Sequence, residues 1–255
     1  NCDYDTTKAF RKAGAKVEMS VFRNLTTQDI FDSIAEMKAN IEKCHILAFC
    51  GGFSAGDEPD GSGKFIANVL NNKDIAEAIE GLIARGGLIL GICNGFQALV
   101  KSGLLPYGHL GCVTKDSPTL FRNDINRHIS QIACTRLATV NSPWLYGLKI
   151  GDTSSIAVSH GEGKFVVNEE LAKELFENGQ VAFQYADPID NAVTMESPYN
   201  PNGSYYAIEG IISRDGRILG KMGHTERYEN NLFKNIVSEK EQPLFDNAVR
   251  YFRGE

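Results

Sequence analysis

The sequence lacks long hydrophobic runs, an excess of basic charge and any secretion signal. No stretch approaches the ~20 consecutive apolar residues of a membrane-spanning helix, and no signal-peptide pattern opens the chain. With 26 Lys and Arg against 32 Asp and Glu, the net charge is −6, which argues against binding to nucleic acid or to an anionic membrane surface. We therefore expect a cytoplasmic protein with no nucleic-acid or membrane partner.

A metal or nucleotide motif is also missing. The six cysteines show no Cys-x-x-Cys spacing and no paired histidine cluster. Two His-x-Glu triplets, at 160–162 and 224–226, have no third ligand at a fixed spacing. Neither Gly-x-x-x-x-Gly-Lys-[Ser/Thr] nor Gly-x-Gly-x-x-Gly occurs. We expect no metal and no cofactor in this chain.

What is present is ordinary globular composition with alternating strand and helix patterns. Apolar residues make up 42% and charged residues 23% of 255 residues, enough to bury a sizeable core. Strands are predicted at 17–21, 46–49, 88–92, 156–159, 181–185, 207–213 and 218–222. Helices are predicted at 6–13, 26–41, 75–84, directly after residue 92, and at 244–252.

This alternation predicts an α/β fold, with a mostly parallel sheet and helices on both faces. Residues 106–155 interrupt the alternation and, with a strand-like stretch at 132–140, are interpreted as a β-rich insert. We expect one domain over residues 1–255. Because the chain opens Asn1-Cys2-Asp3, with no Met and no strand before the first helix, we expect either that residues were removed or that this is a piece of a longer polypeptide.

Cys93 is the strongest candidate for a nucleophile. The segment 91–95 reads Gly-Ile-Cys-Asn-Gly, between an apolar strand and a helix, which is the setting of a nucleophile elbow. Such a turn strains the backbone of the central residue, lifts its side chain above the sheet edge and places the sulfur at a helix N-terminus that favours thiolate. A buried structural cysteine in a tight turn is the alternative.

His224 is the better of two candidate partners for this thiol. It follows the strand 218–222, at the carboxyl end where open α/β sheets place their sites. Glu226 can accept a hydrogen bond from its Nδ1 and support the imidazolium. His160 lies in the glycine-rich turn 159–163, which suits substrate binding better. His45 is expected in the core, and His109 and His128 on the surface.

A glycine-rich loop over 51–57 follows the strand at 46–49. The backbone N–H groups of Gly52 and Phe53, with that of Asn94, are candidates for an oxyanion hole. A phosphate-binding or purely structural turn remains the alternative for this loop.

These motifs together resemble the class I glutamine amidotransferase family, and more closely the glutaminase domains of phosphoribosylformylglycinamidine synthases. The resemblance spans nearly the whole chain. It rests on Gly-x-Cys-x-Gly-x-Gln at 91–97, Ser-His-Gly-Glu-Gly at 159–163, Gly-Gly-Phe-Ser-Ala-Gly-Asp at 51–57 and Asn-Pro-Asn-Gly-Ser at 200–204. The fold that it implies is flavodoxin-like.

The resemblance implies a role for each site residue. Cys93 would form a γ-glutamyl thioester and release ammonia, with His224 as general base and acid and Glu226 orienting it. Gln97, Ser159, His160, Gly161 and Glu162 would hold the glutamine. Ammonia would pass to a synthetase domain or subunit, which would carry ATP and Mg²⁺ and make formylglycinamidine ribonucleotide for purine biosynthesis.

Two departures and two rival functions accompany this interpretation. Gly223-His224-Thr225 stands where the family usually has Pro-His-Pro, which allows a looser His loop, and Cys50 replaces a Pro that often precedes Gly-Gly. Cys50 favours the fused form of the enzyme. The resemblance therefore implies that the chain is the C-terminal piece of a longer chain and lacks its first strand, which in the family precedes Asn-Cys-Asp. The rivals are another cysteine hydrolase on the same fold, such as a peptidase or γ-glutamyl hydrolase, and a non-catalytic regulatory module.

Overall fold

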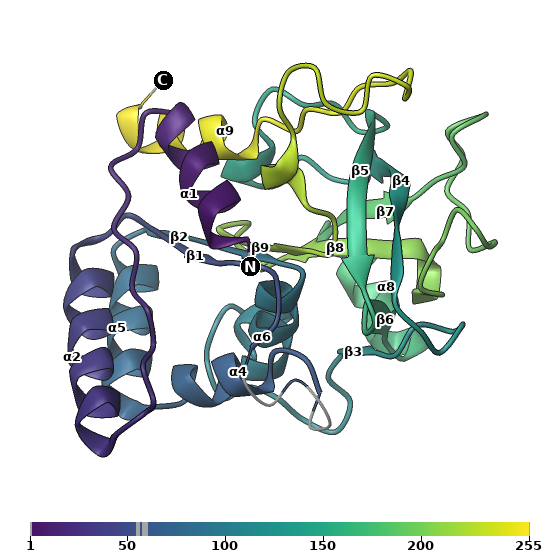
Figure 1. The fold of residues 1–255 in the computed structure, drawn as a ribbon. Helices are drawn as coiled ribbons and strands as arrows, with labels where there is room; N and C mark the ends of the chain where they lie inside the picture. The colour runs from purple at the N-terminus through teal and green to yellow at the C-terminus, as the bar shows by residue number, and fades with distance from the viewer. Residues whose placement is uncertain (1, 55–56, 58–60, 255) are drawn as a thin grey trace.

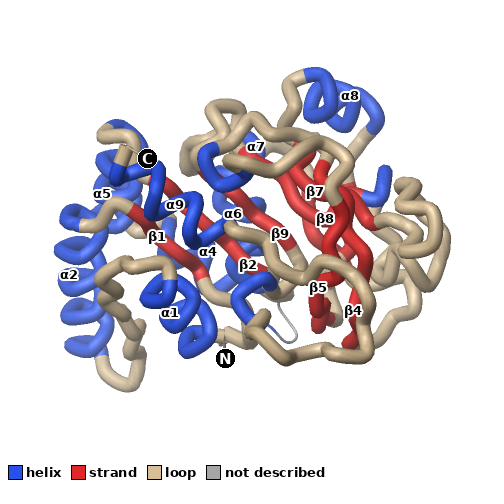
Figure 2. The backbone as a smooth tube through the Cα atoms, turned by 90° about the horizontal axis from the view of Figure 1, so that it is seen from above, coloured by secondary structure: helices blue, strands red, loops and turns tan. Residues whose placement is uncertain are grey.

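A computed structural model describes residues 2–54, 57 and 61–254. Residues 55–56 of the glycine-rich loop and Asn1 lie outside the described residues. The main feature is a 7-stranded sheet in the order β1-β2-β9-β8-β7-β4-β5. Figure 2 shows these strands lying side by side across the molecule.

The first part of the sheet is parallel. β1 (Ile46–Phe49) pairs with β2 (Leu88–Ile92), and β2 pairs with β9 (Ile218–Lys221), both in parallel. β2 is entirely buried, because helices cover both of its faces. The α/β class predicted from the sequence is confirmed, and the carboxyl ends of β2 and β9 meet at one sheet edge.

The remaining strands run antiparallel, which differs from the mostly parallel sheet predicted. β8 (Ile208–Ile212) forms a tight hairpin with β9, and β7 (Val181–Tyr185) pairs antiparallel with β8. A hairpin reverses the chain direction, whereas parallel neighbours need a long crossover connection. Two further strands, β4 (Ile129–Leu137) and β5 (Thr153–His160), complete the antiparallel part.

The segment interpreted as an insert is therefore part of the main sheet. β4 pairs with β5 on one edge and with β7 on the other, so its backbone groups are satisfied within the sheet. Only β3 (Thr119–Phe121) of this segment lies outside, in a two-stranded sheet with β6 (Lys164–Val166). The sheet is strongly curled, so that β4 and β5 run across the direction of β1 and β2 (Figure 1).

Helices lie on both faces of the parallel part (Figure 1). On one face, α1 (Asp3–Lys12) contacts α9 (Leu244–Arg253) through Phe10 and Phe245, whose ring centroids are 4.8 Å apart. On the other face, α4 (Lys64–Leu70) packs beside α6 (Asn94–Ser102). The other described α-helices are α2 (Thr27–Lys43), α5 (Lys73–Ala84), α7 (Leu104–Tyr107) and α8 (Glu169–Glu177), and short 3₁₀ turns lie at Pro143–Leu145, Tyr205–Ala207 and Thr225–Arg227.

The strand predicted at 17–21 is wrong. Among the described residues this segment pairs with no strand and runs instead beside α2, where the Asn40 side-chain amide donates to Ser20 Oγ at 2.9 Å. Alternation of apolar residues indicates a half-buried strand only where a neighbouring strand can take up its backbone hydrogen bonds. Met19 and Val21 are exposed here.

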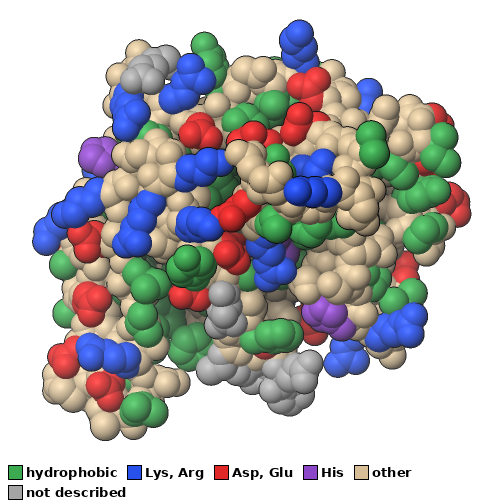
Figure 3. Space-filling view, turned by 45° about the horizontal axis from the view of Figure 1, so that its top comes forward, with side chains coloured by type: hydrophobic (Ala, Val, Ile, Leu, Met, Phe, Trp, Pro, Cys, Tyr) green, Lys and Arg blue, Asp and Glu red, His purple; other side chains and the backbone are tan. Residues whose placement is uncertain are grey.

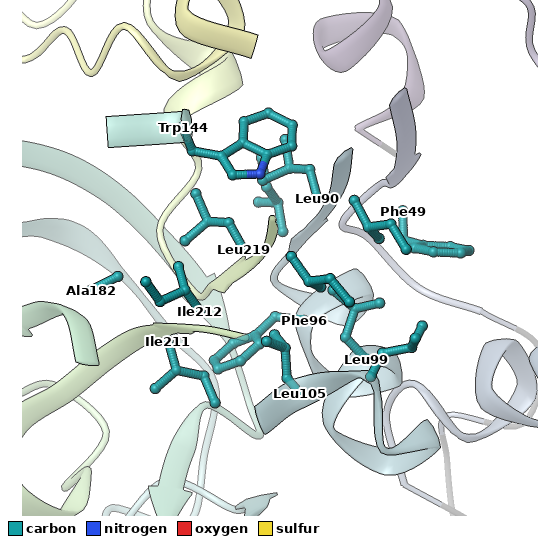
Figure 4. Close-up of a cluster of buried hydrophobic side chains, with 14 of the residues drawn as sticks. Phe49, Leu90, Phe96, Leu99, Leu105, Trp144, Ala182, Ile211, Ile212 and Leu219 are labelled. Carbon is teal, nitrogen blue, oxygen red and sulfur yellow. The ribbon is translucent and has the colours of Figure 1, made fainter. Parts of the chain in front are cut away.

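The core lies on both sides of the β2–β9 pair. Leu90 of β2 and Leu219 of β9 are fully buried on the side of the sheet where Trp144 lies (Figure 4). Phe96 and Leu99 of α6 pack on the opposite side, against the glycines that follow these leucines in β9 and β2. Burying a side chain of this size contributes about 1.5–3 kcal/mol. This packing holds the N-terminus of α6 against the end of β2, which is where Cys93 lies.

The surface carries charges of both signs. Basic and acidic side chains are interspersed over the face drawn in Figure 3, rather than gathered into a field of one sign. No helix in the described part of the chain is long and apolar enough to cross a membrane.

Candidate active site

Cys93 occupies a strained turn between β2 and α6. Its φ of 53° and ψ of −107° lie in a region that side chains rarely adopt. The turn is tight because Gly95 lies against β1: a Cβ there would be 2.0 Å from the Phe49 carbonyl oxygen. The Cys93 N–H donates to the Lys221 carbonyl at 2.8 Å, which ties the turn to the end of β9.

His224 and Glu226 form a buried pair directly after β9. The distance from His224 Nδ1 to Glu226 Oε1 is 2.7 Å, and both side chains are almost completely buried. Burial opposes the charged imidazolium, but the neighbouring Cys2, Cys93 and Glu226 side chains, with the Glu226 charge, outweigh it and raise the pKa of His224 to about 11. At neutral pH this histidine is therefore an imidazolium.

Cys93 and His224 meet on either side of Gly51. A Cβ on Gly51 would lie 2.8 Å from His224 Cε1 and 3.2 Å from Cys93 Cβ, so only glycine fits between them. His224 Nε2 is buried, and no described residue forms a hydrogen bond with it. The Cys93 sulfur lies 3.7 Å from the Ser159 carbonyl oxygen. The thiol and the free ring nitrogen thus share one small space.

That space opens into a cavity of about 240 Å³. Most of the predicted site residues line it, and Glu226 and Asn94 do not. The lining residues are Cys2, Gly52, Phe53, Ser62, Cys93, Gln97, His128, Ser159, His160, Gly161, Glu162, His224 and Arg227.

The glycine-rich loop is held by a buried polar cluster behind the cavity. Asn94 Nδ2 donates to Ser54 Oγ at 2.7 Å and to Asp57 Oδ2 at 3.1 Å. Asp57 also accepts from the backbone N–H groups of Ser54 at 2.6 Å and Gly63 at 3.3 Å. Burial raises the pKa of the Asp57 carboxyl, against these hydrogen bonds. The cluster joins the loop to the N-terminus of α6.

The glycine-rich turn 159–163 forms the opposite wall. The Gln97 side chain donates to the Glu162 carbonyl, and Glu162 Oε2 accepts from the Ser62 N–H at 2.9 Å. His160 is buried, with Nδ1 3.2 Å from Asn123 Oδ1. Burial, and then the charges of His224 and His128, lower its pKa to about 4. His160 is therefore neutral at pH 7.

Four residues of the cavity, Cys2, Ser62, His128 and Arg227, were not predicted from the sequence. Cys2 Sγ lies 3.7 Å from His224 Nδ1, and Arg227 donates to the same sulfur at 3.0 Å. Burial opposes thiolate formation, but hydrogen bonds to His224 and Arg227 lower the pKa of Cys2. His128 is exposed as predicted, yet its Nε2 lies 3.1 Å from Ser159 Oγ at the mouth of the cavity. Only Arg227, next to Glu226, could have been suspected from its position in the sequence.

Cys2, His224 and Glu226 are also the residues that come nearest to a metal-ligand set among those described. Their ligand atoms lie within 4.8 Å of one another. The His224–Glu226 hydrogen bond and the Arg227 guanidinium on the Cys2 sulfur compete with a cation for these atoms. The two remaining histidines lie outside the site. His109 is on the surface, as predicted, and pairs with Glu80 at 2.8 Å. His45 was predicted in the core, but it precedes β1, is exposed and packs against Phe252.

Comparison with known proteins shows the family to which the chain belongs. The family model for the CobB/CobQ-like glutamine amidotransferase domain matches residues 1–252. A protein of Methanococcus maripaludis named phosphoribosylformylglycinamidine synthase subunit PurQ is 35% identical over 271 residues, which cover 99% of this chain and 94% of the relative. The subunit of the same name from Dehalococcoides mccartyi is 35% identical, with coverage of 99% and 94%.

Solved structures show the same fold. The PurLQS structure from Thermotoga maritima matches with a TM-score of 0.66 and 24% identity, over 99% of this chain and 93% of that chain. The glutaminase domain of Trypanosoma brucei CTPS matches with a TM-score of 0.55 and 12% identity, over 99% and 88%. The chain belongs to the CobB/CobQ-like glutamine amidotransferase family. The resemblance found in the sequence is thereby confirmed.

Proposed function

We propose that this chain is the glutaminase of a phosphoribosylformylglycinamidine synthase. It hydrolyses glutamine to glutamate and ammonia, and a synthetase domain or subunit uses the ammonia to make formylglycinamidine ribonucleotide in purine biosynthesis. The names of relatives that match 99% of the chain support this role. ATP and Mg²⁺ belong on the synthetase, and this chain needs no cofactor of its own. The predicted location is the cytoplasm.

In the proposed reaction, the Cys93 thiolate attacks the side-chain carbonyl carbon of glutamine. His224, already an imidazolium, donates its Nε2 proton to the leaving nitrogen, and ammonia departs as the γ-glutamyl thioester forms. The neutral His224 then takes a proton from water, whose oxygen attacks the thioester and releases glutamate. Glu226 keeps the Nδ1 proton in place and stabilises the imidazolium in both steps.

The cavity walls supply the remaining proposed roles. Backbone N–H groups of Gly52, Phe53 and Asn94 stabilise the negative oxygen of the tetrahedral intermediate. Ser159, Gly161 and Glu162 contact the bound glutamine. Gln97 and His160 do not bind glutamine directly in this proposal. The Gln97 side chain donates to the Glu162 carbonyl and His160 is hydrogen-bonded to Asn123, so both residues fix the conformation of the cavity wall.

One observation carries the proposal. A thiol in a strained strand-to-helix turn faces the free nitrogen of a histidine whose other nitrogen is bound to a buried carboxylate, at the wall of a cavity of about 240 Å³. Nucleophile, proton carrier and orienting group therefore stand in the order that acyl transfer through a thioester requires.

The test compares two nitrogen sources in the complete enzyme, with its synthetase. Cys93→Ala is expected to abolish formylglycinamidine ribonucleotide synthesis from glutamine and to leave synthesis from ammonium chloride within about twofold, since only the ammonia supply is lost. Cys112→Ala, at an exposed thiol away from the cavity, is the control and should leave both rates unchanged. Glutamine-dependent synthesis by the Cys93→Ala enzyme would refute the proposal, and cleavage of peptides or γ-glutamyl conjugates would favour a cysteine hydrolase.

A further inference from the structure

A pair of opposite charges lies completely buried beneath the turn that carries His224. Lys221 ends β9 and Glu209 stands in the neighbouring strand β8, with Nζ and Oε1 3.6 Å apart and both side chains 0% exposed. Removing two charges from water costs several kcal/mol per ion, so a buried ion pair adds little stability over an apolar pair. Its place beneath the active site calls for another explanation.

The Lys221 ammonium donates three hydrogen bonds, two to the 223–225 turn that carries His224 and one to Gln242. Nζ donates to the Gly223 carbonyl at 3.2 Å, to Thr225 Oγ1 at 3.0 Å and to Gln242 Oε1 at 2.9 Å. Burial lowers the pKa of Lys221, and the charges of Glu209 and Glu226 oppose that shift. The lysine therefore contacts the turn on both sides of His224.

Glu209 and Gln242 complete the contacts. Glu209 Oε1 accepts from the Gly223 N–H at 2.5 Å, and Gln242 Oε1 accepts from the Thr225 hydroxyl at 2.7 Å. The Gln242 amide is itself oriented, because its Nε2 donates to Thr135 Oγ1 at 3.3 Å. Both backbone polar groups of Gly223 and the side chain of Thr225 are thus held from beneath.

The fit around Gly223 is close. A Cβ there would lie 2.7 Å from Ile156 Cγ2 and 2.8 Å from Glu209 Oε1. The Glu209 carboxylate therefore occupies the space that a larger residue at this position would need. The sequence allows a loose His loop, with Gly223 and Thr225 flanking the histidine, but in the structure the buried charges hold that loop.

We propose that Lys221, Glu209 and Gln242 are positioning residues that hold the 223–225 turn and thereby aim His224 Nε2 at the Cys93 sulfur. None of the three touches the substrate, and the inference rests on the proposed glutaminase function. Displacement of a catalytic group by about 1 Å can cost about 10²-fold in rate. Loss of the Lys221 contacts should therefore lower turnover while leaving glutamine binding intact.

The experiment uses Lys221→Met and Thr225→Val in the complete enzyme, with Thr225→Ser as the matched control. Lys221→Met and Thr225→Val remove contacts of the turn, whereas Thr225→Ser keeps the hydroxyl. We expect kcat for glutamine hydrolysis to fall about 10- to 100-fold in the first two and less than threefold in the control. The Kd for glutamine, measured by calorimetry in a Cys93→Ala background, should stay within about twofold.

A second readout does not need glutaminase activity. Iodoacetamide alkylation of Cys93, followed by peptide mass spectrometry, reports how reactive the Cys93 sulfur is, which depends on where His224 Nε2 lies. We expect it to slow at least fivefold in Lys221→Met and Thr225→Val. If the wild-type enzyme shows no glutamine hydrolysis at all, the proposed function fails, while the alkylation rates still decide on the positioning role.

Two further variants separate positioning from a general loss of stability. Ser142→Ala removes a buried hydrogen bond of 2.6 Å to Gly216, at the far end of the β8–β9 hairpin, and should lower the melting temperature without changing kcat. The double variant Lys221→Met/Glu209→Gln leaves neither member of the ion pair charged. It should be more stable than Lys221→Met alone, but its kcat should stay as low. The proposal is overturned if kcat and the alkylation rate of folded Thr225→Val match those of Thr225→Ser, even where Lys221→Met fails to fold.

Discussion

At the scale of single residues, Glu226 determines which tautomer and charge His224 carries. One carboxylate oxygen accepts the Nδ1 proton at 2.7 Å, and the other, Oε2, is buried with no hydrogen-bond partner among the described residues. A buried carboxylate with so few partners is stabilised mainly by the positive imidazolium beside it. The two groups therefore depend on each other.

Glu226→Gln is expected to lower glutaminase kcat by about 10²-fold or more, because a neutral amide no longer stabilises the imidazolium or ensures its tautomer. Glutamine binding should survive, since Glu226 does not line the cavity. Steady-state kinetics, with calorimetric binding in a Cys93→Ala background, measure both. Glu229→Gln, at an exposed carboxylate on the same segment, is the control. Unchanged turnover in Glu226→Gln would refute the orienting role.

His160 gives a pH dependence of opposite sign to that of His224. Its folded pKa of about 4 lies below the ordinary value of 6.5, so the neutral form stabilises the fold. This stability is fully present above pH 6.5 and is lost as the pH falls toward 4. Between pH 7 and 5 the free energy of unfolding should drop by about 2 kcal/mol from this group alone.

Urea unfolding of the wild type and of His160→Gln at both pH values measures this contribution. The variant should lose less stability between pH 7 and 5 than the wild type, whatever its stability at pH 7. Equal losses in the two proteins would mean that His160 does not stay neutral in the fold.

At the scale of elements, the β2–α6 turn could be predicted and much of the sheet could not. The pattern Gly-x-Cys-x-Gly between an apolar strand and a helix is local, so sequence alone located Cys93. Residues 17–21 and 129–137 show why strands are harder to predict than this turn. Both segments carry a strand-like pattern of apolar residues, but only 129–137 has neighbouring strands with which to pair. Pairing partners distant in sequence decide such segments.

The same limit applies to the site. Motifs predicted His224 and Glu226, because both follow one strand and lie two positions apart. Cys2 reaches His224 across 222 positions, and Glu209 meets Lys221 through strand pairing, so neither contact has a local signal. The backbone N–H of Asn94 stays a predicted member of the oxyanion hole, while its side chain donates to Asp57, a contact that again depends on tertiary packing.

Gly95→Ala tests how tightly this element is packed. The added methyl would lie 2.0 Å from the Phe49 carbonyl oxygen, so β1 and α6 must separate. We expect a loss of about 3 kcal/mol in the free energy of unfolding, together with loss of glutaminase activity. Gly81→Ala in α5 meets only the end of a flexible arginine and should raise stability by about 0.5–1 kcal/mol. Chemical denaturation of both variants checks the contrast.

At the scale of the whole molecule, the curled sheet brings distant parts of the chain to one cavity. Cys93 follows β2 and His224 follows β9. The end of β5 and the residues after it form the turn at 159–163, and Cys2, the N-cap residue of α1, lines the same cavity. The two parallel pairings align the carboxyl ends of β2 and β9, and the antiparallel strands place the opposite wall. The curl of the sheet therefore gathers residues from four distant segments around one cavity.

The most direct test of this account is to trap the thioester. The complete enzyme is mixed with glutamine, quenched with acid within one turnover and examined by intact-protein and peptide mass spectrometry. The account predicts a mass increase of one glutamyl group on the Cys93 peptide, absent from Cys93→Ala and removed by hydroxylamine. Ammonia release by the wild type with no adduct at Cys93 at any quench time, or an adduct on Cys2 instead, would contradict it.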